Sequence, residues 1–409
     1  MSAAPLPIQR NLEPIVEARN LPRDVVKLAC DVVVVGSGAG GSVVATELAE
    51  AGLDVIVVEE GGNVPSDVYA KFRPSETLRH MGREGGTTTT IPIGDTPLVS
   101  ILAGRTVGGS STMTGGICFR VPELISDGWV KQLGLEDYSA ERMAPFYERV
   151  EKRVNVRPVP MEMWSRSQVL FAEGAKKCGM ELKPFRRNVT EACKGWSRCN
   201  FGCPEQAKMS VDISYLPRAR AKGARVWADA RVDRVIVKGD RAAGVEGRLL
   251  NERAGRPGSR FTIESKAVFL CAGTLHTPRL LRNSGVGTSR GVLGRNLTLH
   301  PSFRIAALFD EEVRGWDGAM QAAWSDTYED QGITMTGIFA PLPILAAATP
   351  GVAREYMERV KGLGHLATFG GLVHDEGGGK IWGYVKGEPI ITYRLAPRDK
   401  QRMIQGTRL

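Results

Sequence analysis

The chain has 409 residues, of which 42% are hydrophobic and 7% aromatic, an ordinary globular composition that argues against disorder except at the ends. This length exceeds the usual size of one hydrophobic core, so we expect two closely connected lobes. The formal charge of +9 favours anionic partners, such as an anionic cofactor, an acidic substrate or a membrane surface. No stretch interleaves basic and stacking aromatic residues, so the sequence predicts no nucleic-acid partner.

The sequence carries no targeting signal that we recognise. It has no run of about 18 apolar residues, and its first residues lack the basic-then-apolar pattern of a secretion signal. We therefore expect a cytoplasmic protein without a membrane span. The charge is compatible with membrane-surface association, but no segment indicates it, and the oligomeric state does not follow from the sequence. Seven cysteines, an odd number spread along the chain, do not resemble a disulfide framework.

A dinucleotide-type turn follows the polar extension at residues 1–30. The apolar run at residues 31–35 breaks into glycine and continues as a helical pattern, which predicts a strand, a tight turn and a helix. The glycine spacing is G-x-G-x-x-G, in which the backbone approaches a pyrophosphate that the helix N-terminus binds. A structural glycine turn without a nucleotide is the alternative. The predicted contacts are Gly36, Gly38, Ala39 and Gly41.

A second buried strand is predicted at residues 53–58 and ends at Glu59. A carboxylate at this place can bind ribose hydroxyl groups, so Glu59 is the predicted ribose ligand. Glu60 is the competing neighbour, and strand alternation places the two side chains on opposite faces. The alternative for Glu59 is a solvated acid at a strand end. Residues 66–100 lack strong periodicity and are expected to form a loop, either over a cofactor or on the surface.

The next glycine-rich segment, at residues 104–116, reads GRTVGGSSTMTGG. It resembles the first signature of the glucose-methanol-choline (GMC) family of flavin oxidoreductases, in which a G-R-x-hydrophobic-G-G-S-S loop lies against the FAD pyrophosphate and flavin. The resemblance implies FAD contacts for Gly104, Arg105, Gly108, Gly109, Ser110 and Ser111.

Two details of this segment depart from the family pattern. Thr114 stands where the signature usually has Asn or His, which puts in doubt a flavin contact by that side chain. Some members carry a histidine just after the serine pair that bonds covalently to the flavin. Thr112 and Met113 fill that place here, so the resemblance implies noncovalent FAD.

Residues 123–190 show helical, amphipathic periodicity. The apolar positions at near-helical spacing are expected in the core: Tyr138, Met143, Phe146, Tyr147, Val150 and Val154. Residues 176–225 are rich in lysine and arginine, including Arg187 and Lys208, and such a run usually forms a solvated face.

Within this basic run lie three cysteines, Cys193, Cys199 and Cys203, followed by a proline. Thiolates at this density with basic neighbours can bind an iron–sulfur cluster or a metal. The loop is similar to sugar-oxidising GMC relatives that carry a cluster, and also to the long-chain alcohol oxidase branch, in which a cysteine and glycine loop precedes an A-K-x-S segment. We rank a structural cysteine loop first, with no metal, and a bound cluster second.

Two later segments extend the resemblance. The V-x-R-V segment at residues 232–235 implies that Val232 contacts the adenine, although an ordinary strand valine fits the pattern nearly as well. Residues 267–287 fit the second GMC signature at every fixed position, with a buried strand, a small-residue turn and a helix expected to start near Pro278. This signature implies cofactor contacts for Ala272, Gly273 and Thr277. His300 is expected to be a packed histidine rather than a catalyst.

The predicted fold is α/β, with a Rossmann-like FAD-binding domain and a substrate-binding domain built on a mostly antiparallel sheet. The expected FAD domain comprises residues 31–125 and 205–300, and the substrate-binding region comprises residues 126–204 and 301–395. The latter includes predicted strands at Phe303–Leu308 and Ile390–Leu395. Residues 396–409 are expected to begin a truncated C-terminal segment.

The catalytic residues do not follow from the sequence. In the family, a further C-terminal segment supplies a catalytic histidine and its His or Asn partner. None of the five histidines sits in that motif: His80, His276, His300, His365 and His374. We therefore expect a truncated or split enzyme that is inactive alone, with His276 and His300 as the nearest candidate bases.

Three functions are weighed. The first is an FAD-dependent oxidoreductase that oxidises an alcohol to an aldehyde or ketone by hydride transfer to flavin N5. The second is a sugar or sugar-acid dehydrogenase with an iron–sulfur cluster, and the third is a catalytically incomplete flavin-binding subunit or fragment. A nicotinamide-dependent dehydrogenase would fit the first glycine motif alone and leave both GMC signatures unexplained. The particular alcohol and the electron acceptor do not follow from the sequence.

Overall fold

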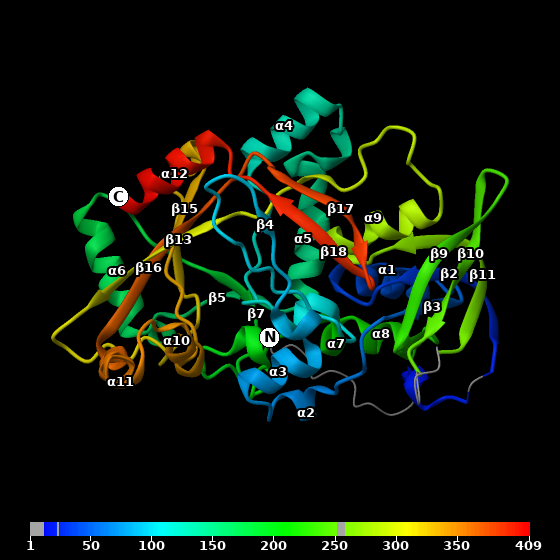
Figure 1. The fold of residues 1–409 in the computed structure, drawn as a ribbon, viewed down its shortest axis with the longest axis horizontal. Coiled ribbons are helices and arrows are strands. Elements are labelled where there is room, and N and C mark those ends of the chain that lie inside the picture. The colour runs from blue at the N-terminus through cyan, green and yellow to red at the C-terminus, as the bar shows by residue number, and fades with distance from the viewer. Residues whose placement is uncertain (1–11, 23, 252–257) are drawn as a thin grey trace. The chain divides into compact units, whose positions relative to one another are not determined.

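The computed structural model describes residues 12–22, 24–251 and 258–409 (Figure 1). Contacts divide the chain into two compact units. The first contains the described residues up to 113 together with 211–301 and 375–400, and the second contains 114–210, 302–374 and 401–409. The first unit therefore includes residues 375–395, which the sequence prediction assigned to the substrate-binding region.

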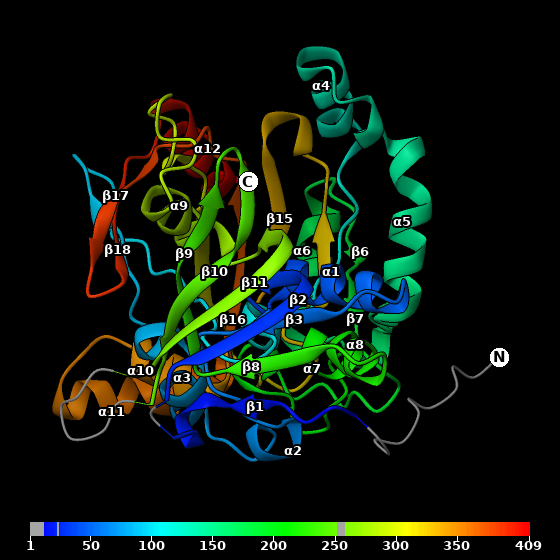
Figure 2. The ribbon, with the colours of Figure 1, turned by 90° about the vertical axis from the view of Figure 1, so that its right-hand side faces the viewer.

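A seven-stranded sheet lies at the centre of the first unit, in the order β1-β8-β3-β2-β11-β10-β9 (Figure 2). The first five strands in this order, β1, β8, β3, β2 and β11, run parallel to one another. Strand β10 is antiparallel to both β11 and β9. The strands are β1 (Val16–Glu17), β2 (Val26–Val35), β3 (Val55–Val58), β8 (Arg225–Ala228), β9 (Ala230–Lys238), β10 (Arg241–Leu249) and β11 (Arg260–Leu270). The helices of this unit are α1 (Ala39–Glu50), α2 (Ser66–Tyr69), α3 (Pro74–Met81), α7 (Val211–Ser214), α8 (Leu216–Ala221) and α9 (Gly273–Asn283).

The valines of β2 explain why this strand lies in the middle of the sheet. Val32 and Val34 share one buried cluster with residues of α1 and α8. Val33 and Val35 point to the other face and share a second cluster with Leu280 of α9. Because both faces are buried, the strand reads as a continuous apolar run rather than an alternating one. The strand begins at Val26, inside the region predicted as an extension.

A four-stranded sheet in the same unit corrects one prediction. It has the order β12-β17-β18-β4, with β18 antiparallel to β17 and parallel to β4. The sequence placed Ile390–Leu395 in the second lobe, but β18 lies here because Ile391 packs with Leu275 of α9 and with Leu297. Residues 66–100, predicted as a loop, contain α2, α3 and β4. The strands are β4 (Ile91–Pro92), β12 (Arg295–Leu297), β17 (Gly379–Val385) and β18 (Glu388–Tyr393).

The second unit is built on an antiparallel five-stranded sheet in the order β13-β16-β15-β14-β6. The predicted α/β class with a second, antiparallel unit is therefore confirmed. The strands are β6 (Lys183–Pro184), β13 (Ser302–Leu308), β14 (Ala323–Ser325), β15 (Ile333–Thr336) and β16 (Leu366–Val373), with a separate pair β5 (Val156–Pro158) and β7 (Arg186–Asn188). The helices are α4 (Glu123–Leu133), α5 (Ala140–Arg153), α6 (Arg166–Lys177), α10 (Leu342–Ala348) and α11 (Ala353–Lys361), and α12 (Pro397–Arg408) follows β18.

The predicted core positions around α5 are mostly wrong. None of the 14 residues of α5 is buried. Tyr138 is 48% exposed and Phe146 51%, whereas Val154, after the helix end, is buried. Helical periodicity identified an apolar face correctly, but it does not show what covers that face.

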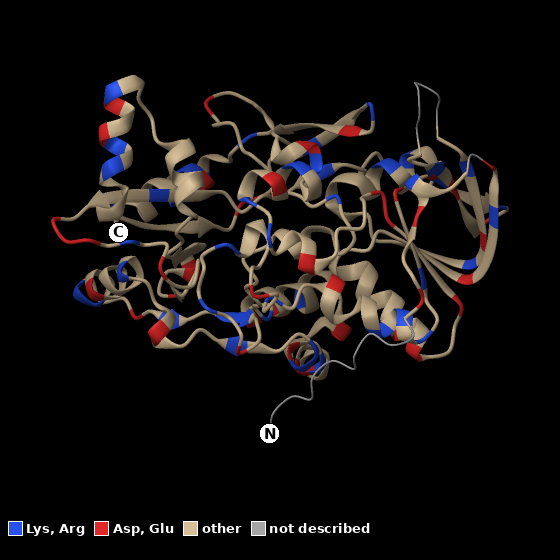
Figure 3. Cartoon of the chain, turned by 90° about the horizontal axis from the view of Figure 1, so that it is seen from below, with Lys and Arg blue, Asp and Glu red and all other residues tan. Residues whose placement is uncertain are grey.

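Basic and acidic residues are interspersed along the elements of both units (Figure 3). Within the basic run at 176–225, Lys183 pairs with Asp326 at 2.7 Å and Arg225 pairs with Asp54 at 2.7 Å. Arg187 and Lys208 depart from the expected solvated face, because they are only 1% and 3% exposed. In the described ranges, no helix combines the length and apolar character needed to cross a bilayer.

Candidate functional site

The turn after β2 admits only glycine at two of its motif positions. Gly36 has a φ of +101°, and a Cβ there would lie 2.4 Å from the backbone oxygen of Cys271. A Cβ on Gly41 would lie 1.9 Å from the backbone oxygen of Gly36. Cys271 follows β11, the parallel neighbour of β2. The turn therefore packs its backbone directly against the end of the adjacent strand.

The first turn of α1 is open to an anion. Gly38 is the N-cap residue, and no side chain caps the helix. Ala39 and Gly40 are exposed, and a Cβ on Gly40 would meet no atom within 4 Å. Unpaired N–H groups and the positive end of the helix dipole therefore face open space, as a pyrophosphate site requires.

Glu59 braces this turn from the end of β3. It is 7% exposed, and its Oε2 accepts hydrogen bonds from the Ser37 backbone N–H at 2.9 Å and the Ser37 hydroxyl at 2.7 Å. Its Oε1 accepts from the Gly61 N–H at 2.8 Å. Burial raises the pKa of Glu59, and these donors oppose that shift. The residue is placed beside the turn, and its contact with a ribose stays a prediction.

The segment at residues 104–116 lies against the glycine turn that follows β2. The Gly108 N–H donates to the Ser37 hydroxyl at 3.0 Å, and a Cβ on Gly109 would lie 2.8 Å from the Cα of Gly38. Ser110 accepts a hydrogen bond from the Gly104 N–H at 2.9 Å, and Ser111 donates to the Gly108 oxygen at 2.7 Å. The two glycine-rich segments therefore form one cluster, in which both serines hold the loop itself.

The second GMC-like segment brings another open helix N-terminus to the same sheet edge. Helix α9 begins at Gly273, five residues before the predicted start, and Pro278 lies inside it. Gly273 has a φ of +73°, and no side chain caps the helix after Ala272. The helix starts earlier because small residues allow it to turn directly out of β11. Thr277 is half-buried in its second turn.

Val232 lies in β9 and is 4% exposed. Ala230, two residues earlier, donates its backbone N–H to the backbone oxygen of Glu59 at 2.8 Å, so this strand start lies beside the predicted ribose ligand. The structure brings Val232 toward the same sheet edge. Its contact with an adenine stays a prediction.

A charged cluster that the sequence did not indicate lies in the same unit. Arg83 bonds Glu60 at 2.8 Å and Glu388 at 2.8 Å, and Arg105 lies 3.7 Å from Glu60. His276 Nε2 lies 3.9 Å from Glu388 Oε2, and neither atom has a hydrogen-bond partner among the described residues. Arg83 falls in a segment without periodicity, so no sequence signal pointed to it.

Burial gives His276 a neutral imidazole. It lowers the pKa of His276 to about 4, and the positive charge of Arg83 acts in the same direction. The other candidate, His300, is exposed and not packed as predicted. Its backbone is left-handed, with a φ of +38°, and its N–H donates to Asp375 Oδ1 at 3.1 Å.

The three clustered cysteines line one pocket of the second unit, and all are free thiols. Within the described ranges, no group of three or more His, Cys, Asp or Glu side chains is arranged to hold a metal ion. This geometry gives no support to a cluster bound by Cys193, Cys199 and Cys203.

The profile of the GMC oxidoreductase family matches residues 30–302, which contain both glycine-rich segments and all of α9. The chain belongs to the GMC oxidoreductase family. A GMC-type oxidoreductase of Mycobacterium tuberculosis is 37% identical over 371 residues, which are 90% of this chain and 57% of that protein. A long-chain-alcohol oxidase of Arabidopsis thaliana is 28% identical over 408 residues, which are 96% of this chain and 52% of that protein.

Solved structures support the same GMC fold. The pyridoxine 4-oxidase from Mesorbium loti superposes with a TM-score of 0.69 at 18% identity and covers 93% of this chain and 79% of that one. A variant of the Aspergillus oryzae formate oxidase, made to study FAD modification, gives a TM-score of 0.68 at 15% identity, covering 94% and 81%. The GMC chain spans about half the length of the curated relatives named above.

Proposed function

We propose that this GMC chain binds FAD at the carboxyl ends of β2, β3 and β11 and serves the oxidation of an alcohol to an aldehyde or ketone. The observation that carries the proposal is the meeting of two uncapped helix N-termini, those of α1 and α9, at the ends of adjacent parallel strands. Ligands bind at such edges in open α/β sheets. The name of the Arabidopsis relatives, long-chain-alcohol oxidase, supports an alcohol as the substrate class.

Backbone groups of the chain would form most of the contacts with the cofactor. The α1 N–H groups after Gly38 would bind the pyrophosphate, and Glu59 would accept ribose hydroxyl groups. FAD, when bound, supplies the hydride acceptor. Thr112 and Met113 are buried and neither can form the histidine–flavin bond, which supports noncovalent FAD.

A test of the cofactor assignment uses Gly38→Ala in the 409-residue chain. Gly38 has an ordinary φ of −66°, and its Cβ would come no closer than 3.9 Å to another atom, so the variant should fold normally. The added methyl group blocks the close approach of a pyrophosphate. We expect FAD affinity, measured by fluorescence titration, to fall more than about tenfold, roughly 1.4 kcal/mol. Gly174→Ala on α6, also in open space, is the matched control.

Equal FAD affinity in both variants would remove this site from the proposal. Acid precipitation of the FAD-loaded protein separates the binding modes, because noncovalent FAD stays in the supernatant. Flavin that precipitates with the protein would contradict noncovalent binding.

A second test concerns the reaction. Addition of a primary long-chain alcohol without oxygen should bleach the flavin band if the chain oxidises alcohols, which requires a group that accepts the hydroxyl proton. His276 lies in the first turn of α9, but its pKa of about 4 makes it a weak proton acceptor at neutral pH. If it is nevertheless the base, His276→Gln would abolish the bleaching. Bound FAD without bleaching would favour the alternative of a flavin-binding piece that is incomplete as a catalyst.

The dehydrogenase with an iron–sulfur cluster is the remaining alternative. Its support is the three-cysteine loop, and its test is iron and sulfide analysis of protein purified without oxygen. The small-molecule alcohol as partner and the cytoplasmic location stay predictions from the sequence.

A further inference from the structure

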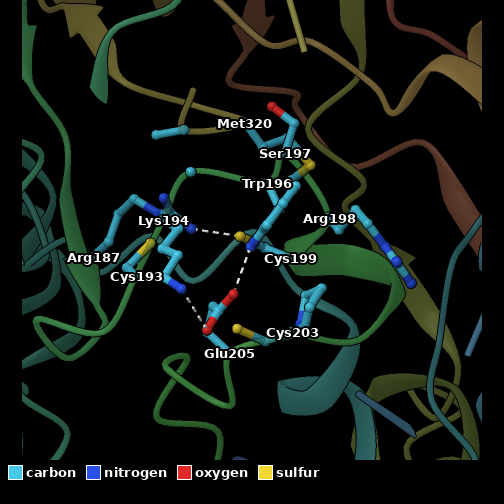
Figure 4. Close-up of a pocket in the computed structure, with 13 residues that line it drawn as sticks. Arg187, Cys193, Lys194, Trp196, Ser197, Arg198, Cys199, Cys203, Glu205 and Met320 are labelled. Atoms are coloured by element: carbon cyan, nitrogen blue, oxygen red, sulfur yellow. Dashed lines mark hydrogen bonds and ion pairs between the residues drawn. The ribbon is translucent and has the colours of Figure 1, made fainter. Parts of the chain in front are cut away.

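The cysteine loop of the second unit surrounds a small cavity. Cys193, Cys199 and Cys203 all line it, together with Arg187 (Figure 4). The cavity measures about 20 Å³, whereas one water molecule needs about 10–15 Å³. The space therefore suits a molecule the size of water or hydrogen peroxide.

Arg187 is a buried cation that points at one of the three sulfurs. It is 1% exposed, its Nη2 donates to the Cys199 Sγ at 2.6 Å, and its Nε donates to the Gly115 oxygen at 3.2 Å. In the part of the chain that the structure describes, no Asp or Glu pairs with Arg187. A buried guanidinium keeps its proton and is costly without partners that accept its hydrogen bonds, and the Cys199 sulfur is one of the two acceptors that Arg187 has among the described residues.

The surroundings of Cys199 hold this arrangement in place. The Lys208 Nζ donates to the Cys199 backbone oxygen at 2.7 Å and to the Thr114 oxygen at 3.0 Å. Glu205 accepts from the Trp196 Nε1 at 2.9 Å and lies 3.6 Å from Lys194. The carboxylate on the cavity lining therefore has its own partners.

Two further thiols lie beside Cys199. The Cys203 Sγ accepts a hydrogen bond from the Ala207 N–H at 3.3 Å. Cys193 interacts electrostatically with Arg187 and with both other thiols, and burial raises the pKa of the Cys193 thiol. A reactive sulfur with neighbouring thiols is the arrangement that redox-sensitive cysteines use.

We propose that Cys199, paired with Arg187, is a peroxide-reactive thiolate that forms a disulfide with a neighbouring thiol of the loop. The thiolate attacks one oxygen of hydrogen peroxide, which breaks the O–O bond and gives a sulfenic acid and hydroxide. The thiol of Cys193 or Cys203 then attacks the sulfenic sulfur, forms the S–S bond and releases water. Peroxide is reduced by two electrons and the thiol pair is oxidised by two. The proposal depends on the loop alone and not on the flavin assignment.

The test treats the reduced 409-residue chain with hydrogen peroxide, blocks the remaining thiols with iodoacetamide and maps the tryptic peptides by mass spectrometry. Trypsin cleaves after Lys194 and Arg198, so Cys193 is released on a different peptide from Cys199 and Cys203. A cross-linked pair of peptides in which Cys203 is alkylated identifies Cys193–Cys199, and a single peptide in which neither cysteine is alkylated identifies Cys199–Cys203. Either bond supports the proposal.

Arg187→Met should slow the oxidation of Cys199 about tenfold or more, because the thiolate is the nucleophile. Arg186→Met is the matched control, since Arg186 lies in the same strand but is exposed and pairs with Glu151. Arg187→Lys keeps a cation beside the sulfur and should restore part of the rate. This variant separates the effect of charge from a general loosening of the loop.

Three results would overturn the proposal. The first is oxidation of exposed Cys178 at the rate of Cys199. The second is an unchanged rate in Arg187→Met, and the third is a loop disulfide that still forms in Cys199→Ser. Stoichiometric iron and sulfide in protein purified without oxygen would also overturn it, because the thiolates would then be ligands.

Discussion

The sheet edge around Gly36 and the cysteine loop around Cys199 are built in different ways. At the sheet edge, backbone meets backbone: Gly36 packs on the oxygen of Cys271, and Gly41 packs on that of Gly36. In the cysteine loop, the side chain of Arg187 from β7 donates a hydrogen bond to one sulfur of the three. The first kind of site leaves glycines at fixed spacing in the sequence. The second kind leaves the clustered cysteines visible in the sequence but not the arginine that contacts one of them, because that arginine comes from a separate segment.

The largest expected change in stability tests the backbone packing at the sheet edge, and it comes from Gly41→Ala. A Cβ at this position would lie 1.9 Å from a backbone oxygen that cannot move aside, so we expect a loss of about 3 kcal/mol or more in the free energy of unfolding. Gly40→Ala, one residue earlier in the same helix, meets no atom and should be neutral or slightly stabilising. Urea denaturation of the two variants measures the contrast. Similar midpoints would show that the turn is not closely packed.

The same difference explains which features could be predicted. The ends of β2, β3 and β11 and the start of α1 followed from apolar runs and glycine spacing, whereas the earlier starts of β2 at Val26 and of β11 at Arg260 did not. The place of Glu59 at the end of a strand was also predicted, and its contact with a ribose stays a prediction. The exposed face of α5 could not be predicted, because periodicity does not show whether another element covers a face. Arg83 and Glu388 lie 305 residues apart and meet only in the folded chain. The burial of Arg187 escaped prediction for the same reason, since the residue follows exposed Arg186 in a basic run and its partners Gly115 and Cys199 come from other segments.

A second prediction concerns His276 at the sheet edge. Its pKa is about 4 in the folded chain against an ordinary 6.5, because burial and Arg83 disfavour the imidazolium. Below about pH 6.5 the unfolded chain binds a proton that the folded chain does not, so stability falls as the pH falls toward 4 and then levels off. We expect a loss on the order of 2 kcal/mol by pH 4.5.

Urea denaturation between pH 7.5 and 4.5 measures this loss, and His276→Gln should flatten the profile over that range. His80→Gln is the control, because this histidine lies in the same unit and contacts Phe72. An equally steep profile in His276→Gln would mean that other groups cause the pH dependence of stability. His276 would then not be the buried neutral histidine described above.

The smallest expected effect concerns Glu151 in the second unit. Its carboxylate links two segments of the chain, those of Arg120 and Arg186. Its carboxylate accepts paired hydrogen bonds from Arg120 and from Arg186, all between 2.9 and 3.0 Å. The hydrogen bonds from Arg120 are the largest cause that lowers the pKa of Glu151 to about 2. The ionised form is therefore favoured in the folded state, and its contribution is present above about pH 4.5 and is lost as the pH falls toward 2.

We expect Glu151→Gln to lower the free energy of unfolding by about 1 kcal/mol at pH 7, near the upper end for pairs at a protein surface. The difference from the unsubstituted chain should shrink below pH 4.5, because the carboxyl group then loses its charge in both states. Asp127→Asn, which removes an exposed pair with Lys131 within α4, is the control and should change little. If both variants lost the same stability at pH 7, the bridge between Arg120 and Arg186 would be no more than an ordinary surface pair. The second unit would then depend less on long-range side-chain contacts than its geometry indicates, and the contrast with the sheet edge would be weaker.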